Sequence, residues 1–336
     1  MTPEEVVLNS GNAAWMLVSA SLVLLMTPAL ALFYGGMTGR RAVLNMMMMS
    51  FGALGVVTVV YVLWGWSMSY GPTSFWGIVA NPFEQFGLSG QITDDAGNYV
   101  AGAGGYANVI DVAFQLTFAV ISTALISGAL AGRVKFGTWL VFTGLWATFA
   151  YFPMAHMVWG GGLLCGVVAI AALTGSARFE FAGGTVVHIN AGMAGLVLAL
   201  VIGARRKFGK EPTRPHNLPL IMLGAGLLFF GWFGFNGGSA FTADGLAGMA
   251  WVNTTTAAGA AMLGWMLYEA LTAKHATSLG AASGVVGGLV AVTPAAGSIT
   301  PVGAIVIGLV AGVACAAAVG LKFKLGFDDS LDVVGV

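Results

Sequence analysis

The most regular feature of the sequence is a series of long, largely uncharged apolar runs separated by short polar segments. A helix needs about 20 apolar residues to cross the hydrocarbon core of a bilayer, and a charge at its centre costs roughly 2.5 to 3.5 kcal/mol. The pattern therefore predicts an all-α polytopic membrane protein, with one membrane domain over residues 1–336. The nine predicted transmembrane helices lie at about 14–37, 42–66, 107–132, 136–158, 182–204, 217–236, 248–271, 277–293 and 302–321.

The number of crossings between Lys135 and Arg178 needs a separate argument, because the 42 uncharged residues between them are enough for two helices. With one crossing, twelve of the thirteen Lys and Arg residues fall on the same side of the membrane, whereas two crossings remove that bias. Segments on the cytoplasmic side are enriched in Lys and Arg. We therefore expect the N-terminus outside, the C-terminus inside, and the apolar segment 160–177 as outer-surface or re-entrant chain.

Composition excludes several classes of function. Hydrophobic residues make up 58% and charged residues 8%, against about 25% charged residues in soluble domains. The 13 basic and 13 acidic residues leave no positive excess for binding nucleic acid. The four histidines have no Cys or carboxylate partner at ligand spacing, and the sequence has no nucleophile motif or phosphate loop. We therefore expect no enzyme activity, no metal and no cofactor.

His188 is the most prominent polar residue within a predicted helix. At 1.5 Å per residue it lies roughly 10 Å below the outer end of its helix, near the membrane midplane. Because burial there disfavours the imidazolium, we expect a neutral ring that can both donate and accept a hydrogen bond. The alternative is a structural histidine bonded to a backbone carbonyl.

A second candidate cluster lies at the outer ends of several predicted helices. It comprises Phe114, Phe118, Trp159, Phe235 and Ser239. The face of an aromatic ring attracts a cation by about 0.5 to 2 kcal/mol, so a Trp with a nearby hydroxyl could hold a small ammonium-like ion. The alternative is that Trp belongs to an interfacial belt and Phe to the packed core.

Glu180 precedes the glycines at which the next helix must begin, so its carboxylate could accept hydrogen bonds from free N–H groups there. We interpret it as a structural cap rather than a catalytic acid. Glycine, 51 of 336 residues, indicates helices that pack backbone to backbone, as in Gly308-x-x-x-Gly312. The strings FYGG at 33–36 and FNGG at 235–238 hint at an internal repeat five helices long, which must have inverted topology.

Several longer segments resemble the ammonium transporter (Amt/Mep/Rh) family, in order from residue 14 to the C-terminus. They are FYGG at 33–36, DVAFQ at 111–115, AHMVWGGG at 155–162, FAGGTVVHIN at 181–190, PHNLP at 215–219, GWFGFNGGSA at 231–240 and VTPA at 292–295.

The resemblance implies transport of ammonium, ammonia or methylammonium through a hydrophobic pore in each subunit of a homotrimer in the cytoplasmic membrane. It implies an eleven-helix fold, two inverted five-helix halves plus one helix, of which nine helices are present here. Trp159, Phe118 and Ser239 would recruit ammonium, Phe118 and Phe235 would form the gate beneath them, and His188 would be the first of two pore histidines. An inner C-terminal tail would bind PII-type signal proteins.

The chain departs from the family pattern at two places. Glu180 stands where the family has aspartate, which leaves the geometry of the cap in question. The family's tenth helix opens with Asp-x-x-Gly-x-His, whereas this sequence reads DVVGV at 332–336 and stops before the histidine. We therefore expect a sequence that is incomplete at its C-terminus, without the last two helices and the inner tail.

Three alternatives to transport remain open on the sequence. The first is a non-transporting ammonium sensor of the same fold, which would be recognised by a signalling domain in the full gene. The second is an intramembrane enzyme with His188 as general base, which lacks a nucleophile or metal set. The third is a gas or water channel, against which the aromatic cluster around Trp159 argues.

We predict that the 336-residue chain alone neither transports ammonium nor forms stable trimers, whereas a longer chain with both pore histidines does, because both halves are needed to close the conduit. Methylammonium uptake in uptake-deficient cells is the measurement. Uptake by the 336-residue chain would contradict this prediction.

Overall fold

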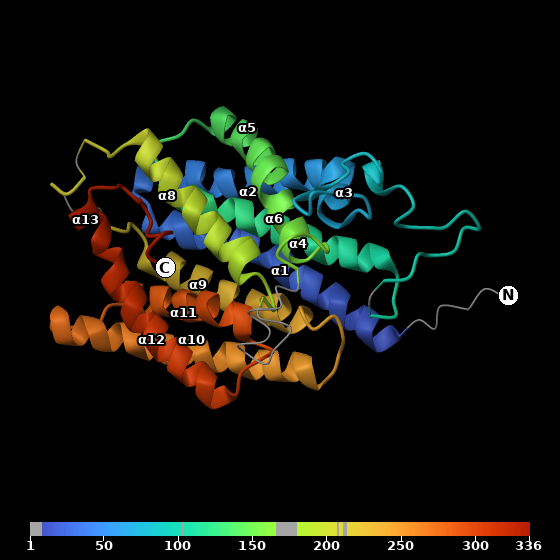
Figure 1. The fold of residues 1–336 in the computed structure, drawn as a ribbon. Helices are drawn as coiled ribbons and strands as arrows, with labels where there is room; N and C mark the ends of the chain where they lie inside the picture. Colours follow the sequence, from blue (N-terminus) through green and yellow to red (C-terminus); the bar gives the residue numbers. More distant parts are fainter. Residues whose placement is uncertain (1–8, 103, 166–179, 207, 211–213) are drawn as a thin grey trace.

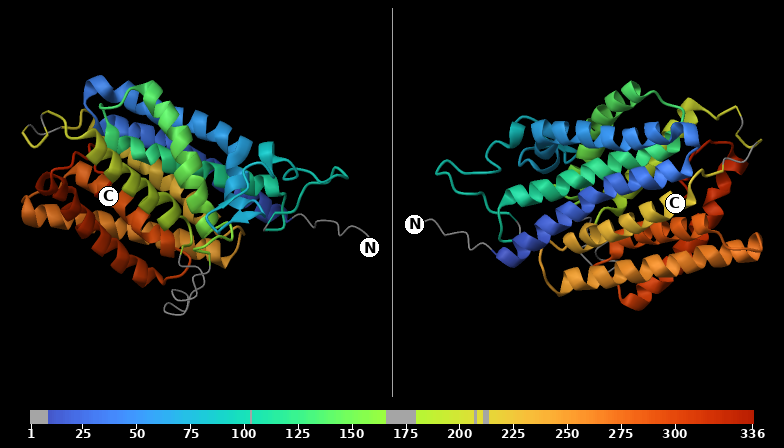
Figure 2. Two further views of the ribbon diagram at one scale, coloured as in Figure 1. Left: turned by 45° about the horizontal axis from the view of Figure 1, so that its top comes forward. Right: turned by 180° about the vertical axis from the view of Figure 1, so that it is seen from behind.

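The computed structural model describes residues 9–102, 104–165, 180–206, 208–210 and 214–336. Within these residues the chain forms nine helical segments that lie side by side in one elongated bundle (Figures 1 and 2). Seven of the nine are long and apolar enough to cross a membrane. The expectation of an all-α polytopic membrane protein is confirmed.

The elements of the first half are α1 Ser10–Met37, η1 Arg40–Ala42, α2 Val43–Val60, η2 Tyr61–Gly65, α3 Trp66–Tyr70, β1 Ser74–Phe75, β2 Val79–Ala80, η3 Phe86–Leu88, α4 Asn108–Ile126, η4 Ser127–Leu130, α5 Phe136–Trp146, η5 Ala147–Tyr151 and α6 Phe152–Val158. Those of the second half are η6 Gly184–Ile189, α8 Asn190–Ile202, α9 Leu218–Trp232, η7 Phe233–Gly237, α10 Gly245–Thr272, α11 Ser278–Val292, η8 Thr293–Ala295, α12 Pro301–Val319 and α13 Leu321–Leu325.

Polar side chains set the starts of several helices. Asn9, Asn217, Thr277 and Thr300 each accept a hydrogen bond from the backbone N–H three residues ahead, at α1, α9, α11 and α12. Such caps satisfy N–H groups that have no partner within the helix. In a membrane this matters more than in water, because lipid offers no replacement partner.

The second helical segment continues past its predicted end. The sequence predicted a loop from about residue 67, but the π-helical turn η2 leads directly into α3, which ends at Tyr70. The loop that follows carries an antiparallel hairpin in which Ser74 pairs with Ala80 and Phe75 with Val79. This loop extends beyond the end of the bundle at which α1 begins (Figure 1).

Residues 160–165 bend back from the end of α6, where the amide of Leu163 donates to the carbonyl of Gly77 in the hairpin (2.7 Å). The remainder of the segment expected on the outer surface or as re-entrant chain, and Arg178, lie outside the described residues.

Close backbone contact between α10 and α12 depends on glycine. A Cβ added at Gly308 would lie 2.4 Å from the carbonyl oxygen of Ala257, and one at Gly312 would lie 2.1 Å from that of Ala261. Both distances are far inside van der Waals contact, so no side chain fits at either position. Gly308 and Gly312, whose spacing predicted close backbone packing, therefore form the contact between α10 and α12.

Helices α1 and α9 make reciprocal contacts at their two ends. Gly36, at the end of α1, lies against the start of α9, where its added Cβ would be 2.8 Å from the carbonyl oxygen of Asn217. At the opposite end, the carbonyl of Gly237 accepts a hydrogen bond from the indole Nε1 of Trp15, near the start of α1 (3.2 Å). The segments FYGG at 33–36 and FNGG at 235–238 thus each end one helical segment of an antiparallel pair and contact the start of the other. An inverted repeat requires this arrangement.

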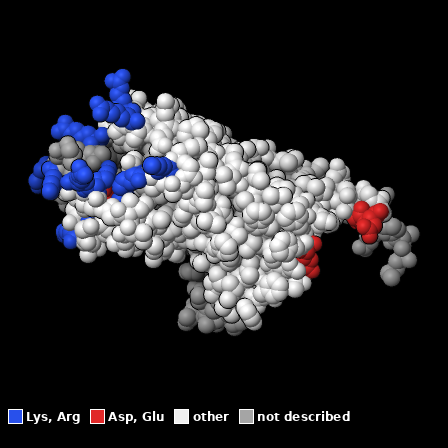
Figure 3. Space-filling view, turned by 90° about the horizontal axis from the view of Figure 1, so that it is seen from above, with Lys and Arg blue, Asp and Glu red and all other residues white. Residues whose placement is uncertain are grey.

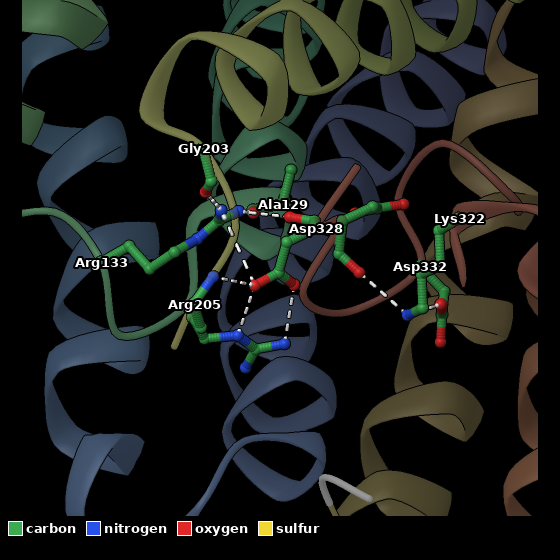
Figure 4. Close-up of polar contacts among 8 residues, drawn as sticks. Ala129, Arg133, Gly203, Arg205, Lys322, Asp328 and Asp332 are labelled. Atoms are coloured by element: carbon green, nitrogen blue, oxygen red, sulfur yellow. Dashed lines mark hydrogen bonds and ion pairs between the residues drawn. The ribbon is translucent and has the colours of Figure 1, made fainter. Parts of the chain in front are cut away.

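An ion cluster at the other end of the bundle holds the segment after α13 (Figure 4). The fully buried carboxylate of Asp328 accepts hydrogen bonds from Nε (2.7 Å), Nη2 (2.8 Å) and the backbone N–H (2.9 Å) of Arg205. Burial acts to raise the pKa of Asp328, but the bonds and charge of Arg205 and the charge of Arg133 keep it below its usual value.

Neighbouring groups complete this cluster. Arg133 donates to the backbone carbonyls of Gly203 and Ala129, and Lys322 forms an ion pair with Asp332. Three segments distant in sequence are thereby joined: the turn after α4, the end of α8 and the segment after α13. Beside them, burial raises the pKa of Asp329 to about 6.

We predict that Asp328→Asn destabilises the fold, because it leaves Arg205 facing a neutral group in a buried site. Breaking a fully buried ion pair costs about 3 to 5 kcal/mol, and since Arg205 is 30% exposed we expect about 2 kcal/mol. Thermal unfolding in detergent measures the loss. Asp95→Asn, at an exposed carboxylate in the loop between α3 and α4, is the matched control. Equal midpoints for the two variants would contradict the prediction.

Candidate functional site

His188 lies on the π-helical turn η6, which leads into α8. The turn begins after Gly183, whose φ of +114° is a conformation that favours glycine, and an added Cβ there would lie 2.7 Å from Val187. π-helical turns are rare and often carry functional groups. The local backbone thus directs His188 away from a regular helical position.

The start of this turn is capped by Glu180. Its carboxylate accepts hydrogen bonds from the backbone N–H of Thr185 (2.8 and 2.9 Å) and of Val186 (3.3 Å). Burial raises the pKa of Glu180, although these hydrogen bonds favour the charged form. The longer side chain in place of aspartate therefore still reaches the free N–H groups of the turn.

A column of aromatic rings leads from the end of α6 to His188. The edge of Trp159 meets Phe118 at 6.0 Å between ring centroids, and Phe118 stacks on Phe235 at 4.1 Å with an interplanar angle of 21°. Phe235 lies 5.8 Å from the ring of His188. His188 also stacks on Trp232 at 5.4 Å and 14°, and Trp232 lies 5.3 Å from Phe235, so these three rings contact one another. Four residues that the sequence singled out are therefore connected by direct ring contacts.

Ser239 and Phe114 flank this column. The hydroxyl of Ser239 donates to the carbonyl of Phe235, one turn earlier (2.8 Å), which leaves its oxygen lone pairs available to accept. The ring of Phe114 packs 4.8 Å from that of Phe118. Phe118 is therefore held between two other phenylalanines.

A cavity of about 340 Å³ lies beneath the aromatic column. Its wall is mainly Leu, Ile, Val and Met, with a few polar groups from His188, Tyr34, Ser283 and Asp332. The Nε2 atom of His188 is buried and has no hydrogen-bond partner among the described residues. An apolar cavity with one available imidazole nitrogen suits a small neutral molecule that gains or loses a proton.

The role of Trp232, which lines the cavity, was not identified from the sequence. Trp232 stacks on His188 and donates its indole N–H to the hydroxyl of Thr293 (2.9 Å), which also contacts Asn236. The Asn236 amide donates to Thr254 (2.9 Å). The signal in the sequence that could have revealed these contacts is the recurrence of polar residues within predicted helices, since such residues need hydrogen-bond partners in a membrane. Sequence spacing alone did not connect 232, 254 and 293.

No group of three or more His, Cys, Asp or Glu side chains capable of holding a metal ion occurs among the described residues.

Comparison with known proteins gives concordant results. The profile of the Ammonium Transporter Family matches residues 14–336. The ammonium transporter of Mycobacterium bovis is 54% identical over 98% of this chain and 71% of its own length. The crystal structure of Saccharomyces cerevisiae Mep2 superposes with a TM-score of 0.85 at 30% identity, over 98% of this chain and 73% of that chain. A sensor Amt protein gives a TM-score of 0.85 at 25% identity, over 97% and 79%.

These likenesses extend over nearly the whole chain, and the M. bovis relative is named as a transporter rather than an enzyme. The chain belongs to the ammonium transporter family.

Proposed function

We propose that this protein carries ammonium or ammonia across the cytoplasmic membrane through the cavity beneath the aromatic column. The observation that supports this proposal best is the continuous series of ring contacts from Trp159 to His188, which ends in an apolar cavity. Methylammonium is the expected substrate analogue.

In this proposal Trp159, Phe118 and Ser239 recruit ammonium at the outer end. Aromatic rings attract a cation through their faces, and a serine oxygen can accept one N–H bond. The stacked pair of Phe118 and Phe235 forms the gate beneath, since rings 4.1 Å apart leave no passage until one of them turns. Glu180 supports the site indirectly, because it holds the turn that carries His188.

The apolar wall below the gate favours passage of the neutral molecule. Moving an ion into a low-dielectric environment costs several kcal/mol even after the protein relaxes. His188 offers a nitrogen to which ammonium can transfer a proton. One N–H bond of ammonium breaks, its electron pair remains on ammonia, and the imidazole lone pair binds the proton. Ammonia then continues through the cavity, and His188 passes the proton on towards the inner side, so that each turnover moves one positive charge.

The charge distribution supports one orientation of the chain. On the face shown in Figure 3, Lys and Arg gather at one end of the bundle and Asp and Glu at the other. Because cytoplasmic segments are enriched in Lys and Arg, we place the basic end inside and the N-terminus outside. We also propose a homotrimer and a PII-type partner on the inner side. These two proposals rest on family membership.

Ammonium sensing without transport is the less favoured function. Likeness to the sensor Amt protein is weaker in sequence than likeness to the M. bovis transporter, at 25% against 54% identity. Measurements of ammonium uptake and of signalling would distinguish a transporter from a sensor, because a pure sensor binds ammonium without saturable uptake.

We predict that Trp159→Leu weakens uptake at low concentration. Loss of a cation–π contact of about 0.5 to 2 kcal/mol should raise the half-saturation concentration roughly twofold to thirtyfold. The measurement is methylammonium uptake by the protein expressed from its complete gene in uptake-deficient cells. Trp76→Leu, at a 90% exposed tryptophan in the outer hairpin, is the control. If Trp159→Leu leaves half-saturation unchanged, Trp159 is only an interfacial residue.

We predict that His188→Ala lowers ammonium-evoked current by about tenfold or more, since a positioned acid–base group contributes about 10² to 10⁴ in rate. Half-saturation should stay as in the unmodified protein, because the outer residues are unchanged. Voltage-clamp recording of the same complete protein measures both quantities. His275→Ala, at an exposed histidine, serves as the control. Undiminished current in His188→Ala would rule out the proton transfer.

A further inference from the structure

His156 is a buried histidine that the transport pathway does not use. It lies in α6, one helical turn before Trp159, and is 1% exposed. Both ring nitrogens have partners: Nδ1 lies 3.1 Å from the carbonyl oxygen of Ser69, and Nε2 lies 2.7 Å from the hydroxyl oxygen of Ser74. Two bonds from one buried ring connect α6 to the end of α3 and to β1.

The partners determine the tautomer of His156. A carbonyl oxygen can only accept, so Nδ1 must carry the proton that is donated to Ser69. In the neutral ring, Nε2 then has a free lone pair, and the Ser74 hydroxyl donates to it. The imidazole therefore donates one hydrogen bond and accepts another, and these two bonds join α6 to α3 and to β1.

The residues that follow Trp159 are held by the same structures. A Cβ added at Gly160 would lie 2.0 Å from the carbonyl oxygen of Ser69, and one at Gly162 would lie 2.4 Å from that of Gly77. The backbone therefore passes directly over α3 and the hairpin, where the Leu163 N–H donates to Gly77. Trp159 is thus anchored both before and after its own position.

Trp159 needs such anchoring because of where it lies. It is the C-terminal cap of α6, the last seven residues of the continuous helical segment that begins with α5. Terminal turns fray readily, and a loose backbone would let the indole turn away from Phe118. Its edge-to-face contact with Phe118 fixes which part of the indole is presented to a cation.

We propose that His156 is a positioning residue for substrate recruitment, which holds Trp159 in place through its bonds to Ser69 and Ser74. This inference rests on the proposed function, since it assumes that Trp159 binds ammonium. His156 touches no substrate in this proposal, and its effect is on the affinity of the outer site rather than on passage through the pore.

The experiment compares His156→Leu, His156→Asn and Ser74→Ala in methylammonium uptake by the protein expressed from its complete gene. Leucine removes both bonds and should raise half-saturation roughly twofold to tenfold, with little change in maximal rate. Asparagine can still donate to Ser69 but cannot reach Ser74, so it should match Ser74→Ala, with a smaller rise. Because Ser74 is exposed, its variant tests the connection even if His156→Leu fails to reach the membrane.

A double-mutant cycle distinguishes positioning from a general loss of structure. In a Trp159→Leu background, Ser74→Ala and His156→Asn should cause no further rise in half-saturation, since their effect passes through Trp159. The matched control is His216→Asn. That histidine also lies within hydrogen-bond distance of a backbone carbonyl, at Thr38 (3.0 Å), but at the inner end of the bundle, and its variant should leave half-saturation unchanged.

The outcomes separate this inference from the proposed function. Absence of saturable uptake by the unmodified protein would overturn the proposed function. Saturable uptake that responds to Trp159→Leu but not to Ser74→Ala or His156→Asn would overturn only the role of His156. The role is equally overturned if these variants lower maximal rate at constant half-saturation, or if their effect persists without Trp159.

Discussion

The cost of placing a charged or unpaired polar group in hydrocarbon is the constraint on which this structure depends. It explains why the helical segments are nearly free of charge and why several of them begin with a side-chain cap. It also explains the polar contacts that occur inside the bundle. Asn236, Thr254 and Thr293 satisfy one another and the indole of Trp232. The buried Nε2 of His188 is one of several side-chain atoms without a hydrogen-bond partner among the described residues, and it belongs to a residue that lines the apolar cavity.

The same constraint governs how helices approach one another. Lipid is as apolar as leucine, so helices associate through close packing rather than through the hydrophobic effect. Gly308 and Gly312 let α12 contact the backbone of α10, and the reciprocal glycine contacts join α1 to α9. A backbone this closely packed resists small displacements, which helps to keep Phe118 and Phe235 stacked 4.1 Å apart. At the end of the bundle that carries most of the Lys and Arg residues (Figure 3), charged groups take over, and Arg205 with Asp328 holds the segment after α13.

Much of the fold was predictable because hydrophobic runs of membrane length have few other interpretations. The role of Glu180 as a cap was also predictable, since a carboxylate before a glycine-rich helix start has nearby N–H partners. The contribution of Trp232 was not, because its partner Thr293 is 61 residues away. Nor was that of His156. It was considered only as a metal ligand, and its two partners, in α3 and β1, lie more than 80 residues earlier.

By itself, the sequence determined what is local: an all-α membrane protein with long apolar helices, and a cap by Glu180 at the start of η6. Tertiary structure alone decided which rings meet. The order Trp159, Phe118, Phe235, His188 and Trp232 draws on four helical segments, and contacts between them depend on helix packing to within an ångström. Hydrophobic periodicity carries no information at that scale, because lipid-facing and pore-facing positions of a membrane helix are both apolar.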